Sequence, residues 1–189
     1  MQKFEDIFGK YIEKSCHNSS LLESDVIGLQ IATEDNAIRV ALSSPCIIPY
    51  SAIAEAQRIL SMNLSARSVA ISARYPSELL GPEAFSLVID YLKAANVPVN
   101  GFFRRAEIMY DNRCFTVRLP EQTVTFLEPL ALPGKIAAQA EALFGIRPQV
   151  SFIPVPDYEL KPIDPRPTVV DDYIPEIPPI PEEAPPWED

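Results

Sequence analysis

The sequence predicts an α+β fold of two related ββαβ modules, followed by a disordered tail rich in proline and acidic residues. Apolar residues alternate with polar ones around a short polar turn at two places in the chain, which is typical of β-hairpins. A helical pattern and a further strand pattern follow each hairpin, in residues 26–73 and again in residues 106–155. The composition then changes at Pro156, after which prolines and acidic residues dominate.

The first module opens with a helical pattern over residues 2–14, whose apolar side chains form one stripe. This helix either packs onto its own domain or binds a partner. Residues 16–20 follow as a predicted loop. Two alternating runs on either side of a Glu-Asp-Asn turn at residues 34–36 predict the first hairpin. Their apolar members are Ile27, Leu29, Ile31, Ile38, Val40 and Leu42.

A helical pattern over residues 51–62 and an alternating run over residues 68–75 complete this first module. Another helical pattern extends from Pro82 to residue 95, and the turn-forming sequence NVPVNG then separates the two modules. We therefore predict three segments. They are an N-terminal α+β module at residues 1–95, a second ββαβ module at residues 96–155 and a disordered linker at residues 156–189.

The second module repeats the plan around a turn at Asp111 and Asn112, two residue types that tolerate a positive φ. Pro120 ends the hairpin, because proline has no N–H to offer a strand ladder. The apolar positions that alternate in this hairpin and in the closing strand are Ile108, Tyr110, Phe115, Val117, Leu119, Val150 and Phe152.

A helical segment lies between this hairpin and its closing strand. Helical spacing begins near Glu121, is broken by Pro129 and Pro133, and restarts over residues 134–144. Gly145 provides the expected C-terminal stop. The predicted stripe of the restarted helix consists of Ile136, Ala140 and Leu143.

Most of the net charge of −10 lies in the tail. Residues 1–155 contain 14 basic against 16 acidic residues, whereas residues 156–189 contain 2 against 10. A nearly neutral body argues against strong binding to a phosphate backbone, which needs a surplus of basic groups. The tail cannot bury enough apolar surface to fold, so we expect an extended spacer of roughly 100 Å. The alternative to a spacer is a set of polyproline ligands, formed by its IPPIP and APPW sequences.

Cysteine use and hydropathy indicate a cytoplasmic protein. Cys16, Cys46 and Cys114 are odd in number and show no CxxC spacing, which favours free buried thiols in a reducing compartment. No apolar run approaches the roughly 18 residues of a membrane span, and the charged N-terminus does not resemble a signal peptide. We expect no contact with a membrane.

The sequence shows no catalytic, cofactor-binding or metal site. The only histidine, His17, lies in a polar loop beside Cys16, where a productive Cys–His pair is not expected. One histidine and three scattered cysteines do not supply a metal-ligand set. The six isolated glycines form no phosphate-binding loop. The one candidate interaction surface is a set of basic residues around the second hairpin: Arg104, Arg105, Arg113 and Arg118.

Two stretches carry a family resemblance. NRCFTVRLPEQTVTFLE at residues 112–128, followed by a helix ending in ALFGI, resembles the N-terminal region of PolC-type DNA polymerase III α subunits of low-GC Gram-positive bacteria. IIPYSAIAEAQRIL at residues 47–60 is similar to the segment that precedes it in that family. The resemblance spans residues 2–155 in order, although none of its motifs is catalytic.

The resemblance implies a truncated KH-like fold, similar to the polymerase-binding C-terminal domain of the clamp-loader τ subunit. In that family the polymerase and 3′–5′ exonuclease domains would follow the tail. None of them lies within residues 1–189, so this segment is not expected to be an enzyme by itself. Its partners would be replisome proteins, such as τ or other replication factors. RNA binding by a KH domain would require a Gly-x-x-Gly loop, and none occurs in this sequence.

Three functional hypotheses remain open at this point. The first is a non-catalytic module that positions a replicative polymerase through protein contacts, with weak or no binding to nucleic acid. The second is a free-standing KH-like module that binds single-stranded nucleic acid through the basic residues between Arg104 and Arg118. The third is a segment that only stabilises a larger enzyme.

Overall fold

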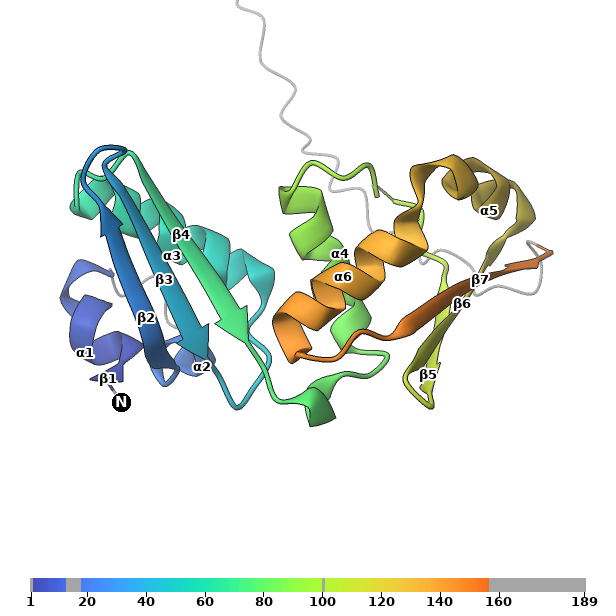
Figure 1. Ribbon diagram of the computed structural model, residues 1–189, viewed down its shortest axis with the longest axis horizontal. Coiled ribbons are helices and arrows are strands. Elements are labelled where there is room, and N and C mark those ends of the chain that lie inside the picture. The colour runs from blue at the N-terminus through green and yellow to red at the C-terminus, as the bar shows by residue number, and fades with distance from the viewer. Residues whose placement is uncertain (1, 13–17, 100, 157–189) are drawn as a thin grey trace, which may run out of the picture.

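The computed structural model describes residues 2–12, 18–99 and 101–156 of the chain. In this part of the protein, six α-helices and three short 3-10 helices accompany two mixed β-sheets, which confirms the predicted α+β class. The two sheets lie side by side along the long axis of the molecule, and α4 (Ala84–Ala94) and α6 (Leu132–Phe144) lie between them (Figure 1). The protein therefore consists of two units, each built on its own sheet.

The first unit contains a four-stranded sheet in the order β1-β2-β3-β4. Its first three strands pair antiparallel, whereas β4 returns parallel to β3 after the long helix α3. The elements are β1 (Gln2–Lys3), α1 (Phe4–Phe8), η1 (Gly9–Tyr11), α2 (Ser19–Leu22), β2 (Asp25–Ala32), β3 (Ala37–Ser43), α3 (Tyr50–Asn63) and β4 (Ser68–Arg74).

The second unit contains a three-stranded sheet in the order β5-β6-β7. β5 and β6 form an antiparallel hairpin, and β7 returns parallel to β6 after a pair of helices. The elements from the end of β4 onward are η2 (Ser77–Leu79), α4, β5 (Glu107–Asp111), β6 (Cys114–Pro120), α5 (Glu121–Leu127), η3 (Glu128–Leu130), α6 and β7 (Gln149–Val155).

Both units share the order hairpin, helix and parallel returning strand. In each unit the central strand pairs with its parallel neighbour over seven residues without a break in register. The second, fourth and sixth residues of the central strand face the core in both units, as the alternation predicts. These residues are Ile38, Val40 and Leu42 in β3, and Phe115, Val117 and Leu119 in β6.

The helices bury the stripes that the sequence predicts. α3 begins after Pro49 and α5 after Pro120, where proline costs no helical hydrogen bond. α6 ends at Gly145, whose φ of 71° is the left-handed conformation expected of a C-terminal glycine. The buried residues of the three long helices include Ile53, Ala56, Ile59 and Leu60 in α3, Phe85, Val88, Ile89 and Leu92 in α4, and Ile136, Ala140 and Leu143 in α6.

The N-terminal prediction is only partly correct. Instead of one helix over residues 2–14, the chain starts with the short strand β1, because Lys3 is extended and pairs with Asp25 of β2. Helix α1 then gives way to a 3-10 turn at Gly9, although Phe4 and Phe8 are buried as expected. Part of the predicted loop at residues 16–20 is also helical, because the Asn18 side chain accepts a hydrogen bond from the Leu21 amide and caps α2.

Two turns in the second unit differ from the prediction by one or two residues. Asp111 pairs with Cys114, so the central residues of the hairpin turn are Asn112 and Arg113, with φ of 47° and 59°. This pattern of two positive φ angles is that of a type I′ turn. The helical segment breaks at η3 and at Ala131, whereas Pro133 lies in the first turn of α6 and does not interrupt it.

Helix α4 lies between the two units. It packs against α3 and α6, and its Phe85 ring contacts the rings of Phe103 and Phe115 in the second unit, each at 5.4 Å between centroids. The division into residues 1–95 and 96–155 stays a prediction, since α4 contacts elements of both segments. The predicted tail lies, apart from Pro156, outside the described residues.

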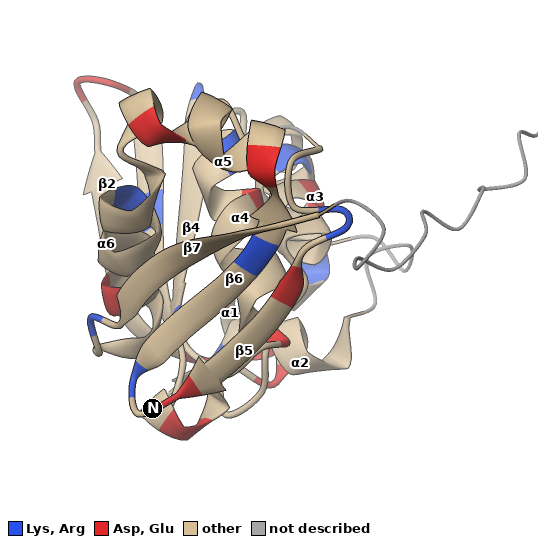
Figure 2. Ribbon diagram, turned by 90° about the vertical axis from the view of Figure 1, so that its right-hand side faces the viewer, with Lys and Arg blue, Asp and Glu red and all other residues tan. Residues whose placement is uncertain are grey.

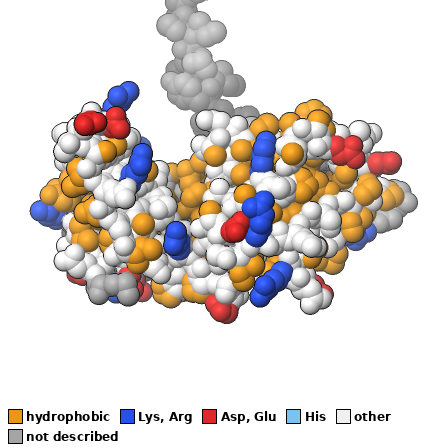
Figure 3. Space-filling model, viewed as in Figure 1, with side chains coloured by type: hydrophobic (Ala, Val, Ile, Leu, Met, Phe, Trp, Pro, Cys, Tyr) orange, Lys and Arg blue, Asp and Glu red, His pale blue; other side chains and the backbone are white. Residues whose placement is uncertain are grey.

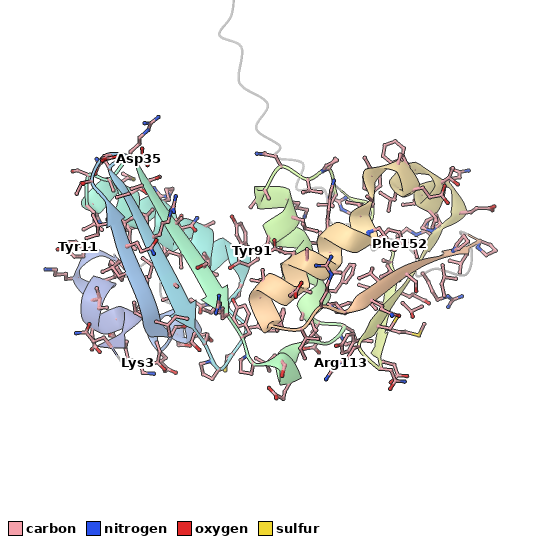
Figure 4. All side chains as sticks on the ribbon, in the orientation of Figure 1. Lys3, Tyr11, Asp35, Tyr91, Arg113 and Phe152 are labelled. Atoms are coloured by element: carbon pink, nitrogen blue, oxygen red, sulfur yellow. The ribbon has the colours of Figure 1, made fainter. Side chains whose placement is uncertain are left out.

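Three tyrosines lie at the junction of the two units, and one of them, Tyr91, is labelled in Figure 4. The Tyr50 and Tyr91 rings meet edge to face at 4.8 Å, and the Tyr75 ring packs on Phe144 of α6 at 5.4 Å. Burial raises the pKa of Tyr75 to about 12 and also raises the pKa of Tyr91 above its ordinary value. The Tyr91 hydroxyl is buried near Tyr75 without good hydrogen-bond geometry. The junction is therefore a packed interface.

Candidate interaction surfaces

The outer side of β2 carries three exposed aliphatic side chains. Ile27 is 45% exposed, Leu29 is 46% exposed and Ile31 is 66% exposed. We call these three the β2 edge residues. Large aliphatic side chains gathered on one exposed strand mark a surface that suits contact with another protein.

The register of β2 on β3 shows which sheet face holds Leu29 and Ile31, two exposed residues that alternate along the strand as core residues do. Leu29 lies opposite Val40, and Ile31 lies opposite Ile38, so these side chains share the sheet face that holds the core. Val40 is buried on β3, but α3 covers this face mainly over β4, at the opposite edge of the sheet from β2. The helix layer therefore does not cover the outer part of β2. The alternation of apolar residues correctly predicts which sheet face these side chains occupy. It does not predict whether a helix covers that face.

The backbone edge of β2 is also open over most of its length. β1 pairs only with Asp25 and Val26, and no other described strand lies on that side of β2. A bulge between Val26 and Gly28 leaves Ile27 without a partner on β3. Exposed edges are usually protected by lysine or proline, and the β2 sequence DVIGLQIA contains neither. Free sheet edges are expected from the sequence, but the sequence analysis did not assign one to β2, although the absence of protecting residues was a readable signal.

The four predicted arginines do not form one surface. Arg118 lies on the open face of the second sheet, and its guanidinium contacts the Glu107 carboxylate at 2.7 Å. Arg113 lies in the hairpin turn, five residues before Arg118 and roughly 16 Å away along an extended strand. Arg104 and Arg105 precede β5 at the opposite end of the hairpin. The structure therefore brings Arg104 and Arg105 together and separates Arg113 from them.

Arg104 and Arg105 line hollows at the end of the second unit that faces away from the hairpin turn. A cleft of about 460 Å³ lies between α4, the segment before β5 and β5 itself, with Phe85, Phe103 and Ile108 among its apolar walls. We call it the Phe103 cleft. A second hollow of about 270 Å³ is lined by Phe102, Arg104, Arg105, Pro120 and Thr123. Arg104 borders both.

The distribution of charge does not favour a nucleic-acid track. Figure 2 shows single basic and acidic positions on the open face of the second sheet, not a basic strip. On the face drawn in Figure 3, the basic side chains are scattered among apolar and neutral ones. A backbone-binding groove needs several neighbouring cations, because each contact contributes through displaced counterions.

The described residues also hold no cluster of three or more His, Cys, Asp or Glu side chains that would suit a metal ion. Cys16 and His17 lie outside the described residues. Cys46 and Cys114 carry free thiols, but Cys46 is exposed and Cys114 only half-buried, so the expectation of buried thiols is wrong for both. Across the described ranges, none of the helices has the length and apolar character needed to cross a bilayer.

Comparison with known proteins found no matching family model, no matching curated protein and no matching solved structure.

Proposed function

We propose that the chain is the non-catalytic N-terminal region of a PolC-type DNA polymerase III α subunit, and that it positions the polymerase through protein contacts. The observation that carries this proposal is the open, aliphatic outer side of β2. The clamp-loader τ subunit or another replication protein is the partner that this hypothesis names.

The β2 edge suits a protein partner on physical grounds. Backbone groups on a free edge accept an added strand, and alternate side chains then provide specificity. Fully burying one aliphatic side chain of this size contributes about 1.5–3 kcal/mol. Ile31, with the largest exposed fraction of the three, has the most to gain from burial. A strand or an amphipathic helix with an apolar face would satisfy this surface.

The KH-like part of the proposal draws support from topology. The second unit contains, in chain order, helix α4, the antiparallel strands β5 and β6, helices α5 and α6, and the returning strand β7, which is parallel to β6. The connection between α5 and α6 contains no Gly-x-x-Gly sequence to clamp a nucleic-acid backbone. We therefore propose a KH-like unit that contacts protein rather than RNA.

The nucleic-acid hypothesis receives less support. Arg118 is engaged with Glu107, which reduces its value as a phosphate contact. Arg113 lies in a tight turn at the other end of the hairpin. Only Arg104 and Arg105 remain close together, and two cations give weak binding at physiological salt.

A binding titration with purified full-length τ subunit tests the proposal. Ile31→Lys places a charge where the partner would bury an alkyl chain, so the affinity should fall at least tenfold, because losing about 1.4 kcal/mol is sufficient for that change. Ile153→Lys is the matched control, since Ile153 is 41% exposed on β7 of the other sheet. The control should bind as the wild type does.

Three outcomes would contradict the proposal. The first is that the wild type binds a single-stranded oligonucleotide even at high salt and that Arg104→Glu abolishes this binding. That result would favour the nucleic-acid hypothesis. Another is equal loss of τ binding in both lysine variants, which would mean that the β2 edge has no special role. The third is unchanged assembly of the parent polymerase after deletion of this region, with only lower heat stability.

A further inference from the structure

The Phe103 cleft has apolar walls and a basic rim. Phe85 and Val99 are buried at its floor, while Phe103 and Ile108 are partly exposed beside it. Lys93 and Arg104 lie at the rim. Lys93 is engaged with Asp90 at 3.3 Å, whereas Arg104 contacts no carboxylate of the described chain. An aromatic cleft next to an exposed arginine suits a ligand that joins an aromatic ring to a negative charge.

The chain itself carries such a segment. Residues 182–189 read EEAPPWED, in which four acidic residues flank a Pro-Pro-Trp sequence. Trp187 is the only tryptophan of the protein. Proline-rich segments bind aromatic grooves at low entropic cost, because their extended conformation is largely formed before binding.

The point where the tail begins lies close to the cleft. Val155, the last residue of β7, pairs with Pro120, which lines the hollow that Arg104 and Arg105 share. Thirty-two positions separate Val155 from Trp187, which is roughly 100 Å of extended chain. The tail therefore starts beside the basic residues and is long enough to return to the cleft without strain.

We propose that residues 182–189 dock into the Phe103 cleft of the same chain. The Trp187 indole packs against Phe103, and the Glu188 carboxylate pairs with the Arg104 guanidinium. Docking of this kind joins the acidic tail to Arg104 and covers the apolar walls of the Phe103 cleft. A tethered segment has an effective concentration of at most about 1 mM, so a contact with a Kd well below that value keeps it docked.

The fluorescence of Trp187 in the full chain reports the docking directly. A docked indole has a blue-shifted emission, and acrylamide should quench it roughly threefold less than in the denatured chain, because a tethered ligand at millimolar effective concentration is mostly bound. Arg104→Glu should shift the emission to the red and restore quenching. Arg113→Glu is the matched control, because Arg113 is also exposed but lies at the far end of the hairpin. It should leave Trp187 protected.

A charge swap makes the test specific. Arg104→Glu combined with Glu188→Arg should recover most of the protection, and circular dichroism of each variant shows whether the fold is intact. Fully quenchable Trp187 in the wild type, equal effects of the two arginine variants, or no recovery in the swap would each overturn the proposal. Protection that disappears on dilution would also overturn it, since the tail would then bind a second copy.

Discussion

The backbone amide of Tyr75 donates a hydrogen bond of 2.8 Å to the carbonyl oxygen of Leu143. Tyr75 follows the last residue of β4 in the first unit, and Leu143 lies in the last turn of α6 in the second. The Tyr75 side chain, only 5% exposed, packs on Phe144 at the same place. Tyr75 thus joins the two units by a backbone hydrogen bond and a ring contact, so the units are expected to unfold together.

Replacing Tyr75 tests this junction. Tyr75→Ala removes a buried ring and should lower the free energy of unfolding by about 3 kcal/mol or more, as aromatic-to-alanine changes in cores do. Tyr75→Phe keeps the ring and should cost only about 1 kcal/mol, because it loses a hydroxyl whose bond to the Ile48 carbonyl is long at 3.4 Å. Urea denaturation followed by circular dichroism measures both. Equal losses, or separate transitions for the two units, would contradict a packed junction.

Alkaline pH should weaken the same junction. Because burial raises the pKa of Tyr75 to about 12, its proton is held more tightly in the folded state than in the unfolded state, where the pKa is near 10. Its stabilising contribution is complete below pH 10 and declines as the pH rises to about 12, by about 1.4 kcal/mol per pH unit. Tyr91 acts in the same direction.

Stability measured by urea denaturation between pH 9 and pH 12 checks this expectation. Tyr75→Phe should show a shallower decline than the wild type over this range, because phenylalanine has no proton to lose. Tyr110→Phe serves as the control, since Tyr110 lies on β5 away from the junction. A decline that is equally steep in the wild type and Tyr75→Phe would show that Tyr75 does not titrate in the way described.

The turn of the second hairpin contains a residue with an unfavourable positive φ, and glycine would adopt this conformation without strain. Arg113 adopts a φ of 59° in the type I′ turn, a conformation that disfavours residues with a side chain. Arg113→Gly should therefore raise the free energy of unfolding by about 0.5–1 kcal/mol, after the greater freedom of glycine in the unfolded chain is counted. Asp111→Gly is the control, because Asp111 ends β5 and has no positive φ. It should destabilise the protein, and a rise in both variants would refute this explanation.

Periodicity predicted much of this fold. Alternation placed the core-facing residues of both central strands correctly, since β3 and β6 are flanked by strands on both sides and covered by helices. The helix stripes were equally readable, because Ile53, Leu92 and Ile136 all belong to faces that must be buried. The predicted repeat of hairpin, helix and strand follows from these same patterns.

What periodicity could not predict depends on neighbours that are distant in sequence. Leu29 and Ile31 alternate as core residues do, yet they are exposed because α3 packs over β4, at the opposite edge of the sheet. The arginines were close in sequence, but the hairpin sends Arg113 to one end and Arg104 to the other. The Phe103 cleft arises where α4 meets the chain before β5, which no local pattern shows.

Amide hydrogen exchange of the full chain, with and without the τ subunit, tests the central claim most directly. If β2 is the docking edge, the amides of residues 27–31 should exchange severalfold more slowly when τ is added, while those of β5 and β7 stay unchanged. Exchange in β2 that τ leaves unaltered, together with slowing around Arg104 and Arg118 on adding a single-stranded oligonucleotide, would contradict it.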